Sequence, residues 1–389
     1  MVDKFFSKTT QNEQALYKEL LEITGALSRL FTESENPFLY YRAMENIFCK
    51  AFNAKNLSRS DISADASKDR LGIGLKTFLQ SNGNTFQKVA EFNKESHLLR
   101  ELSGKNLIEQ VCIMRNERIK STMRICNLND MIYHLITRSK NYMAIYEEHM
   151  DSVDIERITI TNKLKNSIHF CDGKHDYSFS LSKNTLFKRF DTTEHQKIYG
   201  FNVNILEDPF DFLLKAKNES KENFIEFNSQ QSNEVDYIVL PLYSTRTGKV
   251  EEKSGLNQWN ANGRKRDDNE VYINIPAWIH RVKSNFFEYN TPDNKTAPFD
   301  VNLPNGEKLS MRVAQQGGKA LMSNPNSALG KWILRDILRL KPNELVNRNQ
   351  LNLMGIDSIK LTKFDDNTFT LDFLSTGSYE KFEKKTRNK

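Results

Sequence analysis

This sequence of 389 residues has few cysteines, no long apolar run and no apolar segment at its N-terminus. The four cysteines are widely scattered and form no CxxC pair, which argues against a zinc site or a disulfide framework and fits a reducing compartment. No run of eighteen apolar residues is present, so no membrane span is predicted. The opening MVDKFFSKTTQNE lacks the apolar core of a signal peptide, and we therefore expect a cytoplasmic protein.

The chain is both rich in charged residues and long. Charged residues make up 27% of the chain, and the formal net charge of +6 mildly indicates a polyanionic partner. A chain of 389 residues is long enough for two or three domains, each with its own core.

Apolar periodicity divides the chain into two halves. It predicts a helix over residues 10–31 and a second from about 39 to 52, whereas residues 95–150 are expected to be mostly helical. From Arg157 the period changes to two, which predicts a β meander over about 156–190. The polar stretch 215–233 then marks a boundary. We therefore expect an N-terminal domain over 1–230 and a second, strand-rich domain over 234–389.

The segment 58–93 concentrates carboxylates around one lysine. Asp61 and Asp65 share one face of a predicted strand, because strand side chains alternate with a period of two. Lys76 lies on the next predicted strand, and Glu91 lies on a third. Two aspartates within five residues are unusual in a strand, where Asp is depleted.

This combination suits metal-dependent hydrolysis of a phosphodiester. Carboxylates hold a hard cation such as Mg²⁺ through oxygen. A lysine can orient the attacking water and offset the charge that develops on the phosphate. Gly72 and Gly74 leave the strand beside Lys76 without bulk, which would permit close approach of a ligand. The alternative is an ordinary half-buried hairpin with a solvated acidic edge.

Two polar segments of the second half carry side chains that can recognise DNA. Arg, Lys, Asn and Gln match the guanine and adenine edges in the major groove, although solvent-exposed loops often have the same composition. The candidates are Arg246, Lys253, Ser254, Asn257, Gln258, Trp259, Arg264, Arg266, Gln316, Lys319, Ser323, Asn324 and Asn326. Trp259 is equally consistent with a core aromatic. In the meander, Lys183 and Arg189 are candidates for phosphate contacts or for a solvated loop end.

The acidic segment resembles the PD-(D/E)XK core found in many type II restriction endonucleases of bacteria. Ser60-Asp61 stands for the Pro-Asp step, and Gly74-Leu75-Lys76 stands for the (D/E)-X-K step. The resemblance implies a mixed sheet flanked by helices, a Mg²⁺ cofactor and catalysis at these residues. The second acid is missing from its usual place, and the residues that could supply it are Asp65, Glu91 and, on the preceding predicted helix, Glu45.

Residues 236–373 resemble the B3-like effector or target-recognition domain of several restriction endonucleases, a pseudobarrel also used by plant transcription factors. The strings that carry the resemblance are LPLYSTRTGKVEEKSGLNQWNANGR, VYINIP and GGKALMSNPNSALGKWILRD. The resemblance implies two arms that grip the major groove. The first arm would include Arg246, Lys253, Ser254, Asn257, Gln258, Trp259 and Arg264, and the second Gln316, Lys319, Ser323, Asn324 and Asn326.

The sequence as a whole predicts an α+β or α/β multidomain protein, with a nuclease sheet followed by a β pseudobarrel. The predicted function is Mg²⁺-dependent, sequence-specific cleavage of double-stranded DNA, as in restriction–modification. The alternative is a DNA-binding protein with a degenerate, non-catalytic nuclease domain. An RNA substrate is disfavoured because side chains cannot read the deep, narrow A-form major groove. A homodimer is one option, because many such nucleases cut as dimers, but the sequence shows no interface signature.

Overall fold

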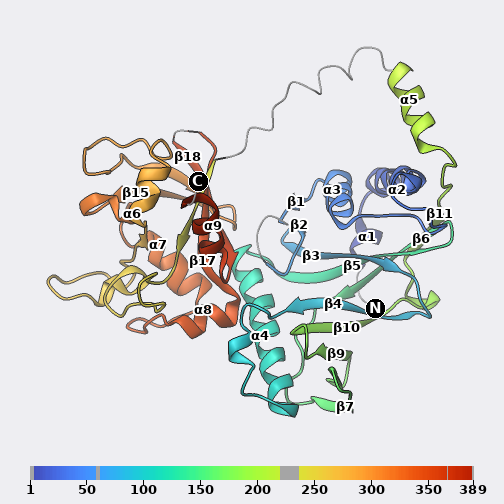
Figure 1. Cartoon of the computed structure of the whole chain (residues 1–389), viewed down its shortest axis with the longest axis horizontal. Coiled ribbons are helices and arrows are strands. Elements are labelled where there is room, and N and C mark those ends of the chain that lie inside the picture. Colours follow the sequence, from blue (N-terminus) through green and yellow to red (C-terminus); the bar gives the residue numbers. More distant parts are fainter. Residues whose placement is uncertain (1–3, 58–61, 220–235, 366, 388–389) are drawn as a thin grey trace.

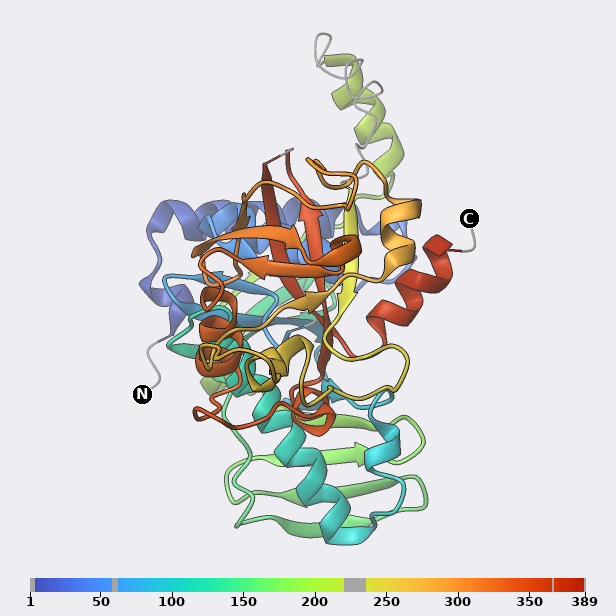
Figure 2. The same cartoon turned by 90° about the vertical axis from the view of Figure 1, so that its left-hand side faces the viewer.

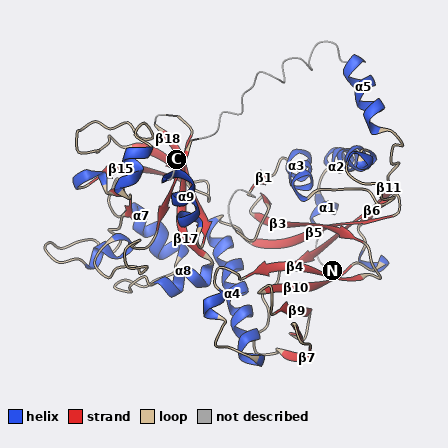
Figure 3. Ribbon diagram, in the orientation of Figure 1, coloured by secondary structure: helices blue, strands red, loops and turns tan. Residues whose placement is uncertain are grey.

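The computed structural model describes residues 4–57, 62–219, 236–365 and 367–387. Within these ranges the chain forms three sheets with helices packed around them (Figures 1 and 3). The predicted first helix begins at a capping box between Thr10 and Glu13. The N-terminal helices are α1 (Phe5–Lys8), α2 (Gln11–Ala26), η1 (Ser28–Leu30) and α3 (Tyr41–Phe52).

Six strands of the described chain form the central sheet, in the order β1-β2-β3-β5-β6-β11. They are β1 (Lys55–Asn56), β2 (Ala66–Lys68), β3 (Leu71–Leu79), β5 (Asp130–Ser139), β6 (Tyr142–His149) and β11 (Tyr199–Asn202). Strands β3 and β5 are parallel, and the connection between them contains α4 (Gly104–Ile125). Helices α2 and α3 cover one face (Figure 1), where Phe48 packs with Ile73 and Ile136.

Two details of the sequence prediction are wrong here. Residues 130–149 form β5 and β6 rather than helix. β5 is buried along most of its length because both faces of the sheet are covered, and a continuous apolar run does not distinguish such a strand from a buried helix. The strand expected over 61–65 is misplaced: residues 62–65 are not in a strand, and β2 begins at Ala66. The β2–β3 hairpin does form, through Asp69 and Arg70, which both have positive φ.

The predicted meander is confirmed as part of a second sheet, here called the meander sheet. Its described strands have the order β4-β10-β9-β8-β7. Their bounds are β4 (Asn84–Glu91), β7 (Thr159–Lys163), β8 (Ser167–Cys171), β9 (Asp176–Ser180) and β10 (Thr185–Asp191), with short helices η2 (Ser96–Leu98) and η3 (Glu194–Gln196) nearby in sequence. Helix α4 lies across one face of this sheet (Figure 2), and its Ile108 and Val111 share a core with Phe170 and Phe179.

The C-terminal region folds around the barrel sheet, whose described strands have the order β12-β17-β18-β14-β15-β16-β13. Its end strands β12 and β13 approach each other, so the sheet nearly closes. The strands are β12 (Tyr237–Pro241), β13 (Ile273–Asn274), β14 (Phe299–Asn302), β15 (Lys308–Ala314), β16 (Ala320–Ser323), β17 (Ile356–Lys363) and β18 (Thr368–Ser375). This architecture is consistent with a B3-like pseudobarrel.

Helices surround the barrel sheet. They are η5 (Gly255–Asn260), α6 (Ala277–Val282), η6 (Gln316–Gly318), α7 (Ala328–Gly330), η7 (Lys331–Ile337), α8 (Arg348–Met354) and α9 (Ser378–Arg387), while α5 (Pro209–Glu219) precedes the sheet. Trp278 and Trp332 are core residues, as predicted, but Trp278 lies on α6 rather than on a strand. None of the helices in the described ranges is long and apolar enough to cross a membrane.

Candidate functional site

The acidic candidate site is built where α3 packs against the β2–β3 hairpin. Asp65 directly precedes β2, and its backbone N–H donates to the Ile73 carbonyl at 2.8 Å. The Leu75 N–H donates to Oδ2 of Asp65 at 2.7 Å, which fixes the orientation of the carboxylate. Lys76 is the next residue along β3. Hairpin pairing therefore brings this carboxylate and this lysine together, as the sequence predicted.

The charges around Asp65 identify its neighbours. Burial raises the pKa of the Asp65 carboxyl, and the negative charge of Glu45 adds to the rise. Lys76 and, more weakly, Arg42 act in the opposite direction on the same pKa. Glu45 lies on α3, is almost fully buried, and accepts a hydrogen bond from Arg42 at 2.8 Å. Two desolvated carboxylates beside a lysine form a set of oxygen donors that suits a hard cation.

Gly74 explains why the expected second acid is missing. A Cβ atom at this position would lie 2.6 Å from the Met150 methyl carbon and 3.2 Å from the Tyr133 ring. A Cβ atom at Gly72 would similarly meet Leu128 at 2.7 Å. The space beside these two glycines is therefore occupied by core side chains of the protein. The expectation that the glycines leave room for a ligand is wrong. No acid fits at position 74 without a rearrangement of the core.

The other predicted acids lie elsewhere. Asp61 falls outside the described residues. Glu91 ends β4 of the meander sheet, where its carboxylate accepts hydrogen bonds from Lys88 at 3.1 Å and from Asn93 at 2.6 Å. The structure thus brings Asp65, Glu45 and Lys76 together but places Glu91 in a different sheet. Across the described chain, no three His, Cys, Asp or Glu side chains are arranged to hold a metal ion.

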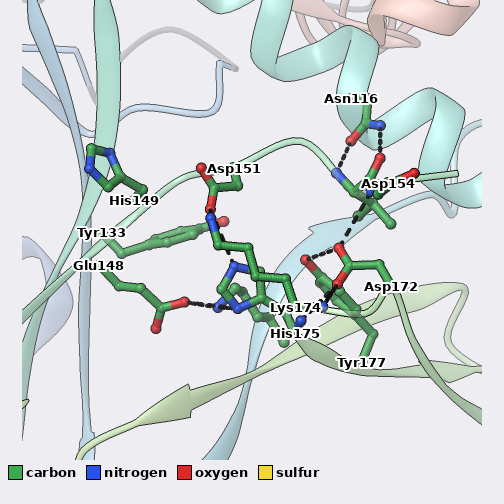
Figure 4. A network of polar contacts seen from close by, with 12 residues as sticks. Asn116, Tyr133, Glu148, His149, Asp151, Asp154, Asp172, Lys174, His175 and Tyr177 are labelled. Atoms are coloured by element: carbon green, nitrogen blue, oxygen red, sulfur yellow. Dashed lines mark hydrogen bonds and ion pairs between the residues drawn. The ribbon is translucent and has the colours of Figure 1, made fainter. Parts of the chain in front are cut away.

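A second charged network joins the central sheet to the meander sheet (Figure 4). The buried ammonium group of Lys188 contacts Glu148 and donates to Nδ1 of His175 at 3.3 Å. Nε2 of His175 faces Asp151 at 3.3 Å. Burial and the positive charge of Lys188 lower the pKa of His175, so the ring is neutral at pH 7. Because both ring nitrogens already face protein groups, we assign this network to holding the sheets together.

The two basic candidates of the meander behave differently. Lys183 is exposed on the β9–β10 hairpin. Arg189 is paired with Asp176 at 3.0 Å, and its guanidinium lies over the Phe86 ring. Both side chains are exposed, but Arg189 is already engaged by Asp176, so Lys183 is the better candidate for a phosphate contact.

A groove of about 870 Å³ opens on the barrel sheet beside the first arm. Three predicted DNA contacts line it, namely Arg246, Lys253 and Ser254. Sequence reasoning missed other polar residues of the lining, among them Tyr243, Lys249, Tyr272 and Asn274. Asn274 lies within VYINIP, one of the strings that carried the resemblance, and Lys249 lies within another, so both could have been found there.

Several predicted reading residues are instead part of the scaffold. Asn257 is fully buried, and its side-chain amide donates to the Val346 carbonyl and accepts from the Val346 N–H, both at 2.9 Å. Ser323 is also fully buried and accepts from the Leu329 N–H at 2.8 Å. Trp259 is half-buried against the barrel core. Asn257 and Ser323 therefore shape the arms and do not reach the surface that a base would touch.

Glu270 organises the rest of the first arm. This buried carboxylate pairs with the guanidinium of Arg264 and accepts from Nε2 of Gln258 at 3.2 Å. Arg266 is mostly buried and donates to the Ala261 carbonyl at 2.6 Å. Arg264 keeps more than half of its side chain exposed, so it alone of these residues can also reach a ligand.

The second arm contains both a strand and a tight turn. The Gly317 N–H donates to Asp293 at 2.6 Å in the turn before β16. Of the predicted contacts, Gln316, Lys319 and Asn324 are exposed. Asn326 is half-buried and faces Arg312. The exposed side chains of this arm therefore remain candidates for DNA contact.

Comparison with known families supports a DNA-binding role for this half of the chain. Residues 214–365 match the family model described as the NgoFVII C-terminal B3-like DNA-binding domain, a restriction-enzyme family. The matched range includes both arms, the groove and most of the barrel sheet. No curated protein matches the chain. The C-terminal region is thus similar to the DNA-binding domain of a restriction enzyme, and DNA is the partner that this similarity supports.

Proposed function

We propose that the protein is a Mg²⁺-dependent endonuclease that recognises a specific sequence in duplex DNA and hydrolyses a phosphodiester bond beside Asp65. One observation carries the catalytic half of the proposal: the desolvated Asp65 carboxyl shares its surroundings with Glu45 and Lys76. The match of residues 214–365 to a restriction-enzyme DNA-binding family supports the recognition half.

The residues of the acidic site have distinct roles in this proposal. Asp65 and Glu45 would bind the cation through carboxylate oxygens, with Asp61 as a third candidate. When bound, Mg²⁺ polarises a phosphoryl oxygen and lowers the pKa of a coordinated water. Lys76 donates hydrogen bonds to the phosphate oxygens and offsets their developing charge. The Leu75 N–H holds the Asp65 carboxylate in one orientation throughout.

The groove would provide recognition. Arg246, Lys249 and Lys253 line it and would neutralise phosphates, which positions the duplex. Asn274 lines the same groove, and Asn324 is exposed on the second arm. An Asn side chain can form a bidentate pair with adenine, so these two amides are the proposed base readers.

A second candidate function is sequence-specific DNA binding without catalysis. Two observations favour it: the absence of space for an acid at Gly74, and the absence of a three-ligand metal cluster in the described part of the chain. This protein would then use the acidic site only as a structural element.

Supercoiled plasmid carrying random genomic inserts separates the two functions. The proposed nuclease converts the plasmid to linear DNA with Mg²⁺ but not with a chelator, and end sequencing returns one recognition sequence. Linear product that forms without a nicked intermediate would further indicate two chains acting together on the two strands. A protein that retards duplex DNA but leaves the plasmid supercoiled with Mg²⁺ supports the non-catalytic candidate.

A further inference from the structure

Helix α4 belongs to the cores of both halves of the molecule. Its middle packs on the meander sheet, whereas its last residue, Ile125, is buried in the core of the barrel sheet. In return, Leu353 of α8 packs against the core that α4 shares with the meander sheet. Figure 1 shows α4 between the two halves, with α8 beside it. The two regions are therefore joined by a mutual apolar contact as well as by the chain.

Polar contacts fix the same interface. Gly355, which ends α8, has a φ of +72°, and a Cβ atom there would lie 2.7 Å from Nε of Arg118 on α4. Lys94 donates to the Ser375 hydroxyl, and Lys55 donates to the Pro304 carbonyl at 2.9 Å. Because a methyl group at Gly355 would overlap the Arg118 guanidinium, this interface has little room at that position.

The loop that carries Asp65 is anchored to α4. Thr122, which is almost fully buried, donates its hydroxyl to the Arg118 carbonyl at 2.8 Å. The same hydroxyl accepts from the Ser63 N–H at 3.0 Å. Ile62 packs against both the barrel core and a core of the N-terminal half. Two residues before Asp65, the chain is thus held by α4 and partly covered by the DNA-binding region.

The first arm is connected to α8, which forms the other side of the contact with α4. Asn257 bonds both backbone groups of Val346, and Asn347 then caps α8. An uninterrupted series of packed elements therefore runs from the arm through α8 and α4 to the loop at Ser63.

We infer that docking of α8 on α4 positions the Asp65 loop, so that the DNA-binding region controls metal binding and cleavage at that loop. Thr122 and Ile62 are positioning residues in this arrangement. The inference rests on the proposed function. When the contact loosens, the Ser63 hydrogen bond and the cover over Ile62 weaken, and the carboxylates lose the geometry that a cation needs.

Two glycine variants test the contact. Gly355→Ala places a methyl group against Arg118, whereas Gly377→Ala, also at positive φ, meets no atom closer than 4.0 Å. Both replacements carry the same backbone strain. We expect only Gly355→Ala to lower cleavage, by about tenfold or more, and to raise the Mg²⁺ concentration required, because support of metal ligands is typically worth about 10- to 100-fold. Duplex affinity should stay within about twofold of wild type in both variants.

Hydrogen exchange adds a readout that does not depend on activity. The amide of Ser63 should exchange faster in Gly355→Ala than in Gly377→Ala. Equal exchange and equal cleavage in the two variants would overturn the inference while leaving the proposed function intact. A wild-type protein with neither cleavage nor a Mg²⁺-induced rise in Tm would overturn both.

Thr122→Val and Thr122→Ser provide a second test, since valine preserves shape and serine preserves the hydroxyl. Thr122→Val should lose about tenfold in cleavage and require more Mg²⁺, with DNA affinity unchanged, because only the support of the metal loop is removed. Thr122→Ser should recover most of the activity. If valine and serine cleave equally at every Mg²⁺ concentration, Thr122 does not position the loop.

Discussion

Buried polar groups are stabilised to different degrees at the acidic site and in the first recognition arm. At the acidic site, burial raises the pKa of Asp65 and a second carboxylate, Glu45, makes its ionisation harder still. In the arm, the fully buried Asn257 is satisfied by both backbone groups of Val346. The arm uses its buried polar groups as scaffold and leaves recognition to exposed ones. At the acidic site, by contrast, burial outweighs the favourable effects of Lys76 and of the Leu75 N–H on the Asp65 carboxylate, and its pKa stays raised.

The largest effect is expected at Asp65 and Lys76. Asp65→Asn or Lys76→Ala should lower cleavage by roughly 10²-fold or more, because the first removes a proposed ligand of the cation and the second removes the positive charge that offsets the charge developing on the phosphate. Cleavage rates at saturating Mg²⁺ measure the loss. Glu91→Gln is the matched control, since Glu91 lies on the meander sheet with its own partners. A normal rate for Lys76→Ala would refute the assignment.

The same Asp65→Asn variant should behave differently in stability. A carboxyl whose folded pKa is raised contributes stability that is present below its unfolded pKa and lost as pH rises through the folded pKa. At pH 7 the ionised group is therefore a cost, and the asparagine variant should unfold at an equal or higher Tm without metal. A clear fall in its metal-free Tm would show that the carboxylate is already compensated by its neighbours.

In the first arm, removal of a buried polar side chain should lower stability. Asn257→Ala should lower the free energy of unfolding by about 2–3 kcal/mol or more, because it leaves the N–H and carbonyl of Val346 buried without partners. Arg246→Ala, on the exposed wall of the groove, should change stability by less than about 0.5 kcal/mol but weaken DNA binding. Denaturant unfolding monitored in the C-terminal region measures both. Similar stabilities for these variants would contradict the division into scaffold and readers.

Local sequence patterns were enough to predict part of the fold and part of the candidate site. The strands after Arg157 were predictable because apolar and polar residues alternate in them, as in β8, whose Ile168 and Phe170 face the core shared with α4. The proximity of Asp65 and Lys76 followed from the predicted hairpin, which forms between β2 and β3. The specific strings of the second half likewise indicated the barrel-like region and its arms.

Other features depend on tertiary packing that no local pattern shows. Glu45 reaches Asp65 only because α3 lies over the hairpin. Glu91 is separated because β4 pairs with β10 and not with the central sheet. Asn257 and Ser323 have the composition of base readers, and only the packing of the arms reveals that they face inward. Residue type thus predicted the chemistry of each region, whereas the fold decided which residues could take part.

A smaller effect should separate two exposed residues of the second arm. Asn324→Ala should lower the preference for the cognate duplex by about 1–3 kcal/mol, as loss of a bidentate base contact would. Lys319→Ala should instead weaken all sequences alike and reduce the salt slope by about one unit. Competition binding at two salt concentrations distinguishes them. Equal losses on cognate and scrambled DNA for Asn324→Ala would make that residue a backbone contact.

The smallest effect concerns His280, which supports the turn of the second arm. Its Nε2–H donates to the Gly318 carbonyl at 2.9 Å, and its Nδ1 accepts from the Tyr289 hydroxyl at 2.6 Å, so the bonded ring is neutral. Burial lowers the pKa of His280. Burial also raises the pKa of Tyr289 to about 12, which keeps this hydroxyl a donor. Protonation of the ring would reverse the hydrogen bond at Nδ1, so that the Tyr289 hydroxyl would have to accept instead of donate.

A depressed histidine pKa contributes stability that is present above its unfolded pKa of about 6.5 and lost as pH falls through the folded pKa. The loss is at most about 1.4 kcal/mol per pH unit. Comparing wild type with His280→Gln from pH 7 to pH 5 isolates this contribution, while His175→Gln serves as the control at a second histidine whose pKa is lowered. His280→Gln should flatten the pH dependence of cognate DNA affinity, because the turn at Gly318 belongs to the second arm. His175→Gln should alter the pH dependence of stability alone. Equal pH profiles of DNA affinity for wild type and His280→Gln would show that the turn does not respond to this ring.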